Sequence, residues 1–443
     1  MGVIANSIPT LIQSEQDMTT EFNVDPHILY PTSPYCQSTG TIDNVRDGDT
    51  FEIEAAMRFE TRASIKVIDG VLELGQPILA DVYKPLGRCV YLVDRTLYAL
   101  FGQRLKAYFA YHDIPLIVLE YRAWEEDKNL RTVQRILEDF RRLGVGRNEP
   151  VLVMGGGVIA DIGGLACAMY NRYPPYVMLC TSIVSGIDAG PSPRTCCDAG
   201  NHKNLYGAYQ APVLTLTDRT FFATLPTGCL RHGVAEILKM AIMRDFELFV
   251  LLEEHGTELI RTKFATVGRA DDKAFINVCN RIISLSLLRY IEAEYVNLFE
   301  THQMRPHAYG HTWSPGFELP TGLLHGHAVS IGMAFGATLA HRVDWIDSQQ
   351  RDRIIRLCGL LELATHHPVL DDTEMIWRCQ QSMIQKRGGH LCAPLPMNAI
   401  GWDGYLNEVP KNLLGETLAL HQKIGTGLPR GGAQGNRMKL LFN

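Results

Sequence analysis

The chain lacks a hydrophobic run of membrane-spanning length and any block of basic residues, and each absence excludes a class of protein. Its longest apolar runs, such as 151–154, have the length of a strand, whereas a membrane-spanning helix needs about 18 or more apolar residues. The formal net charge is −6, and no basic cluster offers an electrostatic surface to nucleic acid. The sequence therefore predicts a protein that acts neither in a membrane nor on nucleic acid.

Paired cysteines and export signals are also missing. The 11 cysteines are an odd number in a long chain, they form no C-x-x-C pair, and only Cys196 and Cys197 are adjacent. The first residues contain no basic segment followed by an apolar stretch, and Asn6 stands where a myristoylation motif needs Ser or Thr. Because disulfide scaffolds are typically short and secreted, we expect reduced thiols and a cytoplasmic protein.

The composition is that of a large globular protein, with 443 residues of which 46% are hydrophobic and 20% charged. That length predicts two to three domains. The pattern along the chain predicts a loose, polar N-terminal arm at 1–48, an α/β domain at 49–225, a helical domain at 226–424 and a glycine-rich tail at 425–443.

Strand and helix patterns alternate in the first half. Residues 51–54 and 65–74 have strand patterns, with a turn at Asp69-Gly70. Further strands are predicted at 88–94, 114–120 and 151–154, with helices at 96–111 and 129–143. This order is typical of a Rossmann-like parallel sheet covered by helices, with a ligand at the carboxyl ends of the strands.

The pattern becomes mainly helical after about residue 225, where strand signals nearly vanish. The predicted helices are 227–254, 272–294, 327–342, 348–363 and 413–422. The predicted fold class is thus α/β, an N-terminal Rossmann-like parallel-sheet domain followed by a mainly α-helical domain.

A glycine-rich turn follows the strand at 151–154. Gly155, Gly156 and Gly157 lead into a helix, where backbone N–H groups can approach a pyrophosphate and the helix N-terminus favours its charge. The spacing differs from G-x-G-x-x-G, so an ordinary turn between strand and helix is an open alternative.

Histidines cluster between residues 302 and 327. Five of the 15 lie there: His302, His307, His311, His325 and His327. Neutral imidazoles are zinc ligands, and a carboxylate ligand could come from Glu236, which shares a helix face with Lys239. The alternative for any single histidine is an ordinary buried or surface imidazole.

A polar segment rich in glycine and proline follows the predicted strand at 176–180. It contains Asp188, Arg194, Lys203 and Asn204. Basic side chains in such a segment suit a phosphorylated or polyhydroxylated substrate, although solvated surface is the alternative interpretation.

In this order, the motifs resemble those of the dehydroquinate-synthase-like sugar phosphate cyclases over about residues 60–425. The matching segments are the glycine turn with Asp161, Arg172, Thr181-Ser182, Asp188, Lys203-Asn204, Glu236-x-x-Lys239, Gly310-His311-Thr312 and His325-Gly326-His327-Ala328-Val329. The resemblance implies an NAD-binding α/β domain, a helical metal domain, a cleft between them and a homodimer.

Carried over residue by residue, the resemblance implies a zinc site, with cobalt as a candidate substitute, at Glu236, His311 and His325. The implied NAD contacts are Asp94, Lys128, Gly155, Gly156, Gly157, Asp161, Thr181 and Ser182. The implied catalytic and substrate-binding groups are Asp188, Arg194, Lys203, Asn204, Lys239, Lys386 and, after a one-residue shift, Arg305. Arg172 matches an arginine that reaches into the neighbouring subunit's site.

Four departures from dehydroquinate synthases bear on the substrate: Arg194 replaces a Lys, Ala308 an Asn, Pro315 a His and His327 a Glu. Fewer polar partners disfavour the carboxylated dehydroquinate precursor, because a carboxylate buried without partners is costly. Pro315 and the segment 186–198 resemble instead the cyclitol branch, which uses sedoheptulose 7-phosphate. Within that branch they most resemble desmethyl-4-deoxygadusol synthases, which start mycosporine-like sunscreen synthesis.

The resemblance implies an NAD- and zinc-dependent lyase that oxidises the sugar transiently, eliminates phosphate, restores the hydride and closes the ring by an aldol step. The desmethyl-4-deoxygadusol product requires a further dehydration. The alternatives are a 2-epi-5-epi-valiolone synthase, a 3-dehydroquinate synthase, a metal-dependent polyol dehydrogenase and a sugar-phosphate-binding protein without activity.

Overall fold

The computed structural model describes residues 35–47, 50–200 and 202–425, in two compact units. The described part of the first unit is an antiparallel hairpin of β1 (Cys36–Asp47) and β2 (Thr50–Thr61), in which Cys36 pairs with Thr61. The prediction of a loose arm up to residue 48 is therefore wrong for 36–47, because the strand that follows supplies a partner along its whole length. The rest of the predicted arm lies outside the described residues.

The second unit contains a six-stranded parallel sheet, as the alternating pattern predicts. Its strand order is β3-β10-β7-β6-β4-β5. The strands are β3 (Ser64–Val67), β4 (Cys89–Asp94), β5 (Leu116–Tyr121), β6 (Val151–Gly155), β7 (Tyr176–Cys180) and β10 (Leu214–Thr217). The four inner strands are buried along their whole length, which explains their continuous hydrophobic runs.

Helices cover both faces of this sheet. They are α1 (Ile78–Tyr83), α2 (Arg95–Tyr111), α3 (Leu130–Arg142) and α4 (Gly157–Met169). Alternate residues of β4 enter different cores: Tyr91 packs with α1 and α2, and Leu92 with α3 and α4. The side chains of Asp94 and Asn129 accept hydrogen bonds from the first backbone amides of α2 and α3, respectively. These two N-caps explain where the helices begin.

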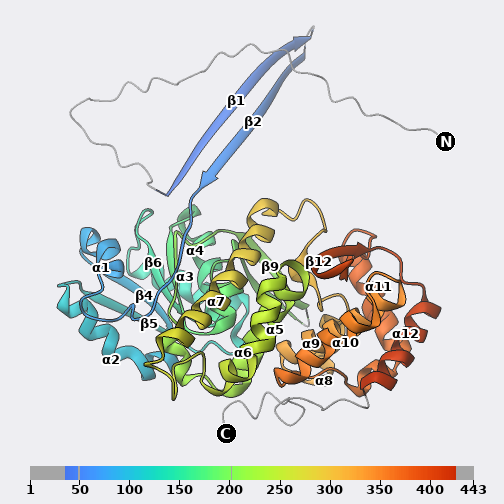
Figure 1. Ribbon diagram of the computed structural model, residues 1–443. Helices are drawn as coiled ribbons and strands as arrows, with labels where there is room; N and C mark the ends of the chain where they lie inside the picture. Colours follow the sequence, from blue (N-terminus) through green and yellow to red (C-terminus); the bar gives the residue numbers. More distant parts are fainter. Residues whose placement is uncertain (1–34, 48–49, 201, 426–443) are drawn as a thin grey trace. The chain divides into compact units, whose positions relative to one another are not determined.

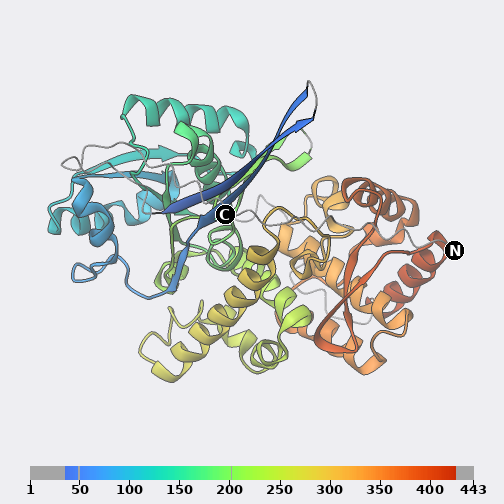
Figure 2. The ribbon, with the colours of Figure 1, turned by 90° about the horizontal axis from the view of Figure 1, so that it is seen from above.

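The helical part follows the sheet along the chain. Its helices are α5 (Thr227–Arg244), α6 (Phe246–Arg261), α7 (Lys273–Glu294), α8 (Ser314–Thr321), α9 (His325–Arg342), α10 (Ser348–Leu360), α11 (Thr373–Lys386) and α12 (Lys411–Gly425). The α/β part (blue to green) and the later helices (orange to red) lie on opposite sides of this unit in Figures 1 and 2. The predicted fold class is confirmed, whereas the domain boundaries at 48, 225 and 424 stay predictions.

Short helical turns join these elements. They are η1 (Lys84–Leu86), η2 (Glu125–Asp127), η3 (Tyr170–Arg172), the π-helical turn η4 (Ser185–Ala189), η5 (Arg219–Thr224), η6 (Tyr295–Asn297), η7 (Pro306–Ala308) and η8 (Pro368–Asp371). Four of them, η2, η3, η4 and η7, carry residues discussed below.

Several local predictions are wrong. The predicted helix 227–254 is two helices, because Asp245 has an extended backbone and caps α6 by accepting a hydrogen bond from the Leu248 amide at 2.9 Å. Residues 71–74 are not a strand, since the chain turns at Gly70, where φ is +74°.

The sequence patterns also missed three helices, one strand of the parallel sheet and two hairpins. These are α1, α8, α11, β10, the pair β8 (Arg194–Ala199) and β9 (His202–Tyr209), and the pair β11 (Ala393–Met397) and β12 (Ala399–Leu406). Neither hairpin has a strong strand signal, because the first is polar and β11 contains two prolines.

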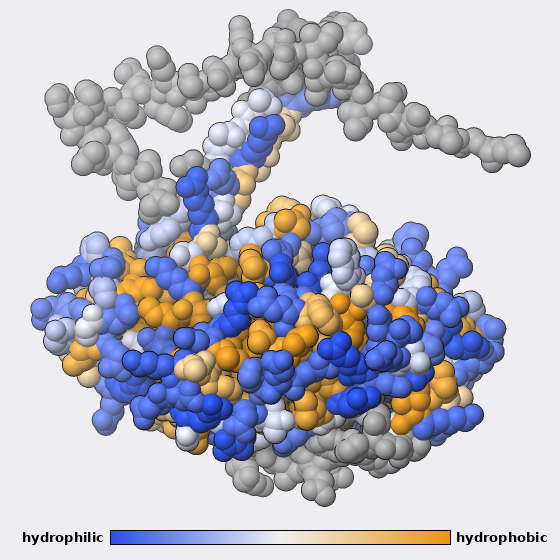
Figure 3. Space-filling view, in the orientation of Figure 1, coloured by the Kyte–Doolittle hydropathy of each residue, from blue (hydrophilic) through white to orange (hydrophobic). Residues whose placement is uncertain are grey.

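In the described part of the chain, one helical stretch, Lys273–Asn297, is long and apolar enough to cross a membrane by length and composition alone. Core helices of soluble proteins pass the same test, and α7 buries Ile282 and Ile283 in the helical core. Apolar patches (orange) on the face shown in Figure 3 are separated by charged and polar residues (blue). We therefore interpret α7 as a core helix.

Candidate metal and substrate site

Three side chains from separate segments converge on one point. Glu236 lies within α5, His311 in the turn before α8, and His325 at the first position of α9. Their ligand atoms all lie within 4.8 Å of one another. The Nε2 atom of His325 is 3.4 Å from Glu236 Oε1 and 3.3 Å from His311 Nε2.

The chemistry of these donors fits a divalent metal. Glu236 is fully buried, and neither carboxylate oxygen meets hydrogen-bond geometry with a described residue, although the Lys239 ammonium forms an ion pair with it. Burial, with Lys239 nearby, lowers the pKa of His311 to about 3, so this imidazole is neutral and its lone pair is available. One carboxylate and two imidazoles are a zinc donor set that leaves positions for a substrate.

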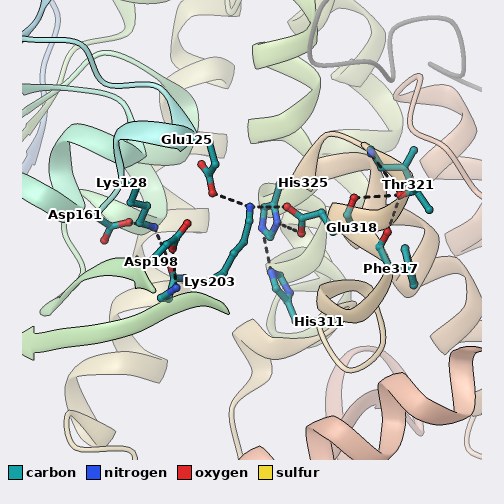
Figure 4. A network of polar contacts seen from close by, with 12 residues as sticks. Glu125, Lys128, Asp161, Asp198, Lys203, His311, Phe317, Glu318, Thr321 and His325 are labelled. Atoms are coloured by element: carbon teal, nitrogen blue, oxygen red, sulfur yellow. Dashed lines mark hydrogen bonds and ion pairs between the residues drawn. The ribbon is translucent and has the colours of Figure 1, made fainter. Parts of the chain in front are cut away.

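The far nitrogen of each imidazole is also held. His325 Nδ1 lies 2.9 Å from Glu318 Oε2, and His311 Nδ1 lies 3.1 Å from the Tyr309 carbonyl oxygen. Such contacts orient a ligating ring and leave Nε2 facing the metal position. Figure 4 shows Glu318 to the right of His325 and His311 below it.

Lys203 connects this metal position to the α/β part. Its Nζ atom lies 2.8 Å from Glu125 in η2 and 2.8 Å from Glu318 in α8 (Figure 4). A second lysine, Lys128, follows η2 and contacts β9 in return, because its Nζ atom donates to Asn204 Oδ1 at 2.6 Å. The two contacts join β9 to the turn at 125–128.

Lys128 also contacts α4, the helix that follows the glycine turn. Its Nζ atom lies 2.6 Å from Asp161 Oδ2 on α4, and its side chain is almost fully buried. Two residues that the resemblance assigns to NAD thus form one ion pair beside Asn204. Asp94, a third, accepts hydrogen bonds from the Thr96 and Ala123 amides at the end of β4.

The three glycines have different surroundings at the carboxyl end of β6. A Cβ on Gly155 would lie 1.9 Å from Ile159 Cγ2, so this glycine permits close packing. A Cβ on Gly156 would lie 3.6 Å from its nearest neighbour, Ser182 Oγ, and one on Gly157 would lie 3.7 Å from Ala189 Cβ, so neither would collide. No side chain caps α4 at Gly156, so the first amides of the helix face this space uncapped.

Thr181 and Ser182 border the same turn from the end of β7. The Thr181 amide donates to the Gly155 carbonyl oxygen at 3.2 Å, which ties the two strand ends together. Ser182 Oγ lies 3.0 Å from Ser185 Oγ. The structure therefore places the glycine turn, Thr181 and Ser182 at one edge of the sheet, where parallel sheets bind ligands.

A second polar group lies next to the metal position. Lys239 Nζ donates to Tyr290 Oη at 2.6 Å, and Asp188 in η4 hydrogen-bonds with the same phenol. Burial raises the pKa of Asp188, and the Glu236 carboxylate adds to this, while the Lys239 ammonium opposes it. These groups form a buried network of donors and acceptors that suits a polyhydroxylated ligand.

Two arginines share acidic partners beyond this network. Arg194 pairs with Glu294 at the end of α7 and lies 3.2 Å from Glu300, and Arg305 lies 2.6 Å from Glu300. These four side chains and His307 line a small cavity. The structure thus brings Arg194 and Arg305 together, as the resemblance implies for a substrate site.

Two residues with implied roles are not in this group. Arg172 is exposed in η3, in a left-handed run of residues in which its φ is +58°. Lys386 is exposed at the last position of α11, whereas the next residue, Arg387, is buried and donates to the Cys392 carbonyl oxygen at 3.1 Å. Burial, with Arg305 nearby, lowers the pKa of Arg387 to about 10.

Sequence patterns missed the acidic and aromatic residues that organise the site. These are Glu125, Tyr290, Glu294, Glu300 and Glu318. Single acidic residues in polar or helical segments are typical of solvated surface, so no pattern marked them. The histidine cluster was a partial signal, since His302, His307 and His327 lie outside the metal group. His327 Nδ1 accepts from the Ala364 amide at 3.2 Å.

Comparison with known proteins identifies the class. Models of the 3-dehydroquinate synthase N-terminal and C-terminal domains match residues 118–232 and 233–383. The chain belongs to the 3-dehydroquinate synthase family of sugar phosphate cyclases.

Within that family, the chain is 36% identical to the demethyl-4-deoxygadusol synthase of Trichormus variabilis, over 86% of this chain and 92% of that protein. It is also 36% identical to the 2-epi-5-epi-valiolone synthase of Streptomyces albus, over 75% of this chain and 81% of that protein. The solved 2-epi-5-epi-valiolone synthase from Streptomyces hygroscopicus subsp. jinggangensis, with NAD+ and Zn2+ bound, superposes with a TM-score of 0.76 at 33% identity, covering 82% of this chain and 98% of that one.

Proposed function

We propose that this protein converts sedoheptulose 7-phosphate to desmethyl-4-deoxygadusol as an NAD- and zinc-dependent, phosphate-eliminating lyase. One observation carries the proposal: the three metal donors lie beside the network of Lys239, Tyr290 and Asp188 and a pair of arginines. The same region has Ala308 and Pro315 where dehydroquinate synthases use polar side chains. The similarity to a demethyl-4-deoxygadusol synthase supports the choice of product.

Glu236, His311 and His325 would hold the zinc, and the turn at Gly156 with Thr181 and Ser182 would hold NAD. When bound, NAD supplies a transient hydride acceptor and zinc polarises a substrate oxygen. The NAD+ and Zn2+ in the related valiolone synthase support both assignments. Cobalt is a candidate substitute for zinc.

The remaining groups bind and orient the sugar phosphate. Lys239 and Asp188 would contact hydroxyls, because both already hydrogen-bond with Tyr290. Arg194 and Arg305 would bind the phosphate by exchanging part of their contact with Glu300 for its oxygens, as planar guanidinium groups bind phosphate in two-pronged fashion.

The second candidate is a 2-epi-5-epi-valiolone synthase, since such enzymes are nearly as similar to the chain. It would use the same substrate but omit the further dehydration, so its product would lack a conjugated enone. A 3-dehydroquinate synthase and a metal-dependent polyol dehydrogenase rank below it, in that order.

We further propose a cytoplasmic homodimer. Arg172 supports it, because the side chain is exposed and the resemblance places it in the neighbouring subunit's site.

Phosphate release from two substrates tests the substrate assignment. Purified protein with NAD and zinc should release phosphate from sedoheptulose 7-phosphate and essentially none from the carboxylated seven-carbon precursor of dehydroquinate. Efficient formation of dehydroquinate would contradict the proposal.

A further inference from the structure

His307 is a buried histidine that forms no hydrogen bond with any residue the structure describes. It lies in η7, with 8% of its surface exposed. Neither ring nitrogen has a hydrogen-bond partner among the described residues. Buried polar groups in folded proteins are nearly always paired, so an imidazole with two unpaired nitrogens needs an explanation.

The ring lies at the substrate side of the site. It lines the small cavity together with Arg194, Glu294, Glu300 and Arg305. Its centroid is 5.8 Å from that of Tyr290, whose hydroxyl accepts from Lys239. His307 therefore lies between the two sets of residues proposed to bind the substrate: Lys239 and Asp188 for hydroxyls, and the two arginines for phosphate.

The surroundings keep this imidazole neutral. Burial, together with the nearby charges of Arg194 and Lys239, lowers the pKa of His307 well below its usual value. A neutral imidazole has one N–H donor and one lone-pair acceptor. A hydroxyl group matches both functions, whereas a carboxylate accepts only and would leave the lone pair facing negative charge.

We propose that His307 contacts the substrate directly, through hydrogen bonds with hydroxyl groups of the sugar phosphate. The inference rests on the proposed function and adds to it a residue that reads hydroxyls rather than a carboxylate. It also accounts for an unpaired imidazole in the protein without ligand, because the partner arrives with the substrate.

Calorimetric binding of sedoheptulose 7-phosphate to the zinc-loaded protein with NADH tests this role. NADH prevents the initial oxidation, so binding is measured without turnover. His307→Leu should weaken binding about tenfold or more, and His307→Gln, which keeps a donor and an acceptor, should recover part of the loss. Zinc content and NADH affinity should stay at wild-type values.

The melting temperature separates a ligand contact from a structural role. Replacing an unpaired buried imidazole by leucine should leave Tm unchanged or raise it. His421→Gln is the matched control, because both His421 nitrogens have partners, Thr338 and Thr365; it should lower Tm and leave sugar phosphate binding unchanged.

Unchanged sugar phosphate binding in His307→Leu would overturn the inference. A lower Tm would also overturn it if the loss of binding matched the fraction of protein that is unfolded, because His307 would then be structural. Failure of the proposed function has a different signature, namely wild-type protein that does not bind sedoheptulose 7-phosphate. In that case the carboxylated precursor is the second probe; binding of it that depends on His307 would contradict the hydroxyl assignment.

Discussion

At the scale of single residues, Glu318 on α8 connects the metal ligand His325 to Lys203 on β9. Its two oxygens contact different partners, Lys203 at 2.8 Å and His325 at 2.9 Å. Burial alone would raise the pKa of Glu318, but the neighbouring His325 and Lys203 lower it well below its ordinary value, so the group is a carboxylate. A ligating histidine held in this way presents Nε2 to a metal in a fixed orientation.

Glu318→Gln should therefore weaken zinc binding about 10- to 100-fold, because the charged partner of His325 is lost. Competition between the purified protein and a zinc chelator measures the affinity directly. Glu149→Gln is the matched control, since Glu149 forms a similarly buried ion pair with Arg88 outside the site, at 2.7 Å. Equal zinc affinity in wild type and Glu318→Gln would show that Glu318 does not orient the ligand.

The turn from β6 into α4 is the element that defines the nucleotide side. Its two leading glycines serve different purposes, since a side chain on Gly155 would collide with Ile159, whereas one on Gly156 would enter open space near Ser182. The first glycine thus serves packing, and the second keeps the helix N-terminus accessible to a phosphate.

The two positions should respond differently to substitution. Gly156→Val should weaken NAD binding, measured by calorimetry, with little change in Tm, because the added side chain fills the proposed pyrophosphate position. Gly155→Ala should instead lower Tm, by an amount set by how far Ile159 can move. If Gly156→Val binds NAD with wild-type affinity, the turn does not hold the cofactor.

Sequence patterns predicted most of the buried strands but not the polar or proline-containing hairpins, and they also missed the short inner strand β10. The inner strands β4 and β6 are continuous hydrophobic runs, and α7 matches the predicted helix 272–294 to within one residue, with Asp272 as its N-cap. The hairpin β8–β9 was missed because most of its residues are polar and those of β9 are largely exposed, although it carries Lys203 and Asn204. The contacts of Lys203 with Glu125 and Glu318 are long-range ion pairs, which no local pattern contains.

The site residues could be predicted from the sequence only where their proximity depends on local spacing. Glu236 and Lys239 are one helical turn apart, so their proximity could be predicted from spacing. His311 and His325 come from different segments, and only the resemblance selected them from the five clustered histidines. Glu318 is seven residues from His325, yet its role depends on how α8 turns back towards α9.

At the scale of the whole molecule, Arg172 is, with Lys386, one of two implied site residues that the single chain leaves outside the site. Its exposure agrees with a role in a neighbouring subunit. Arg172→Ala should raise the KM for the sugar phosphate without changing zinc content.

Mixing Arg172→Ala with Glu236→Ala tests the shared site. Each variant should be impaired alone, and heterodimers should regain activity because one of their two sites contains both native residues. An absence of recovery after verified subunit exchange would count against a site shared between subunits.

The most direct test of the central claim follows the wild-type reaction of sedoheptulose 7-phosphate with NAD and zinc, by absorbance and by the mass of the product. A cyclase that returns its hydride should consume the substrate fully with a catalytic amount of NAD and accumulate no NADH. The proposed product should also show the ultraviolet absorbance of a conjugated enone. NADH formed in step with substrate loss, or a saturated ketone product without that absorbance, would contradict the account.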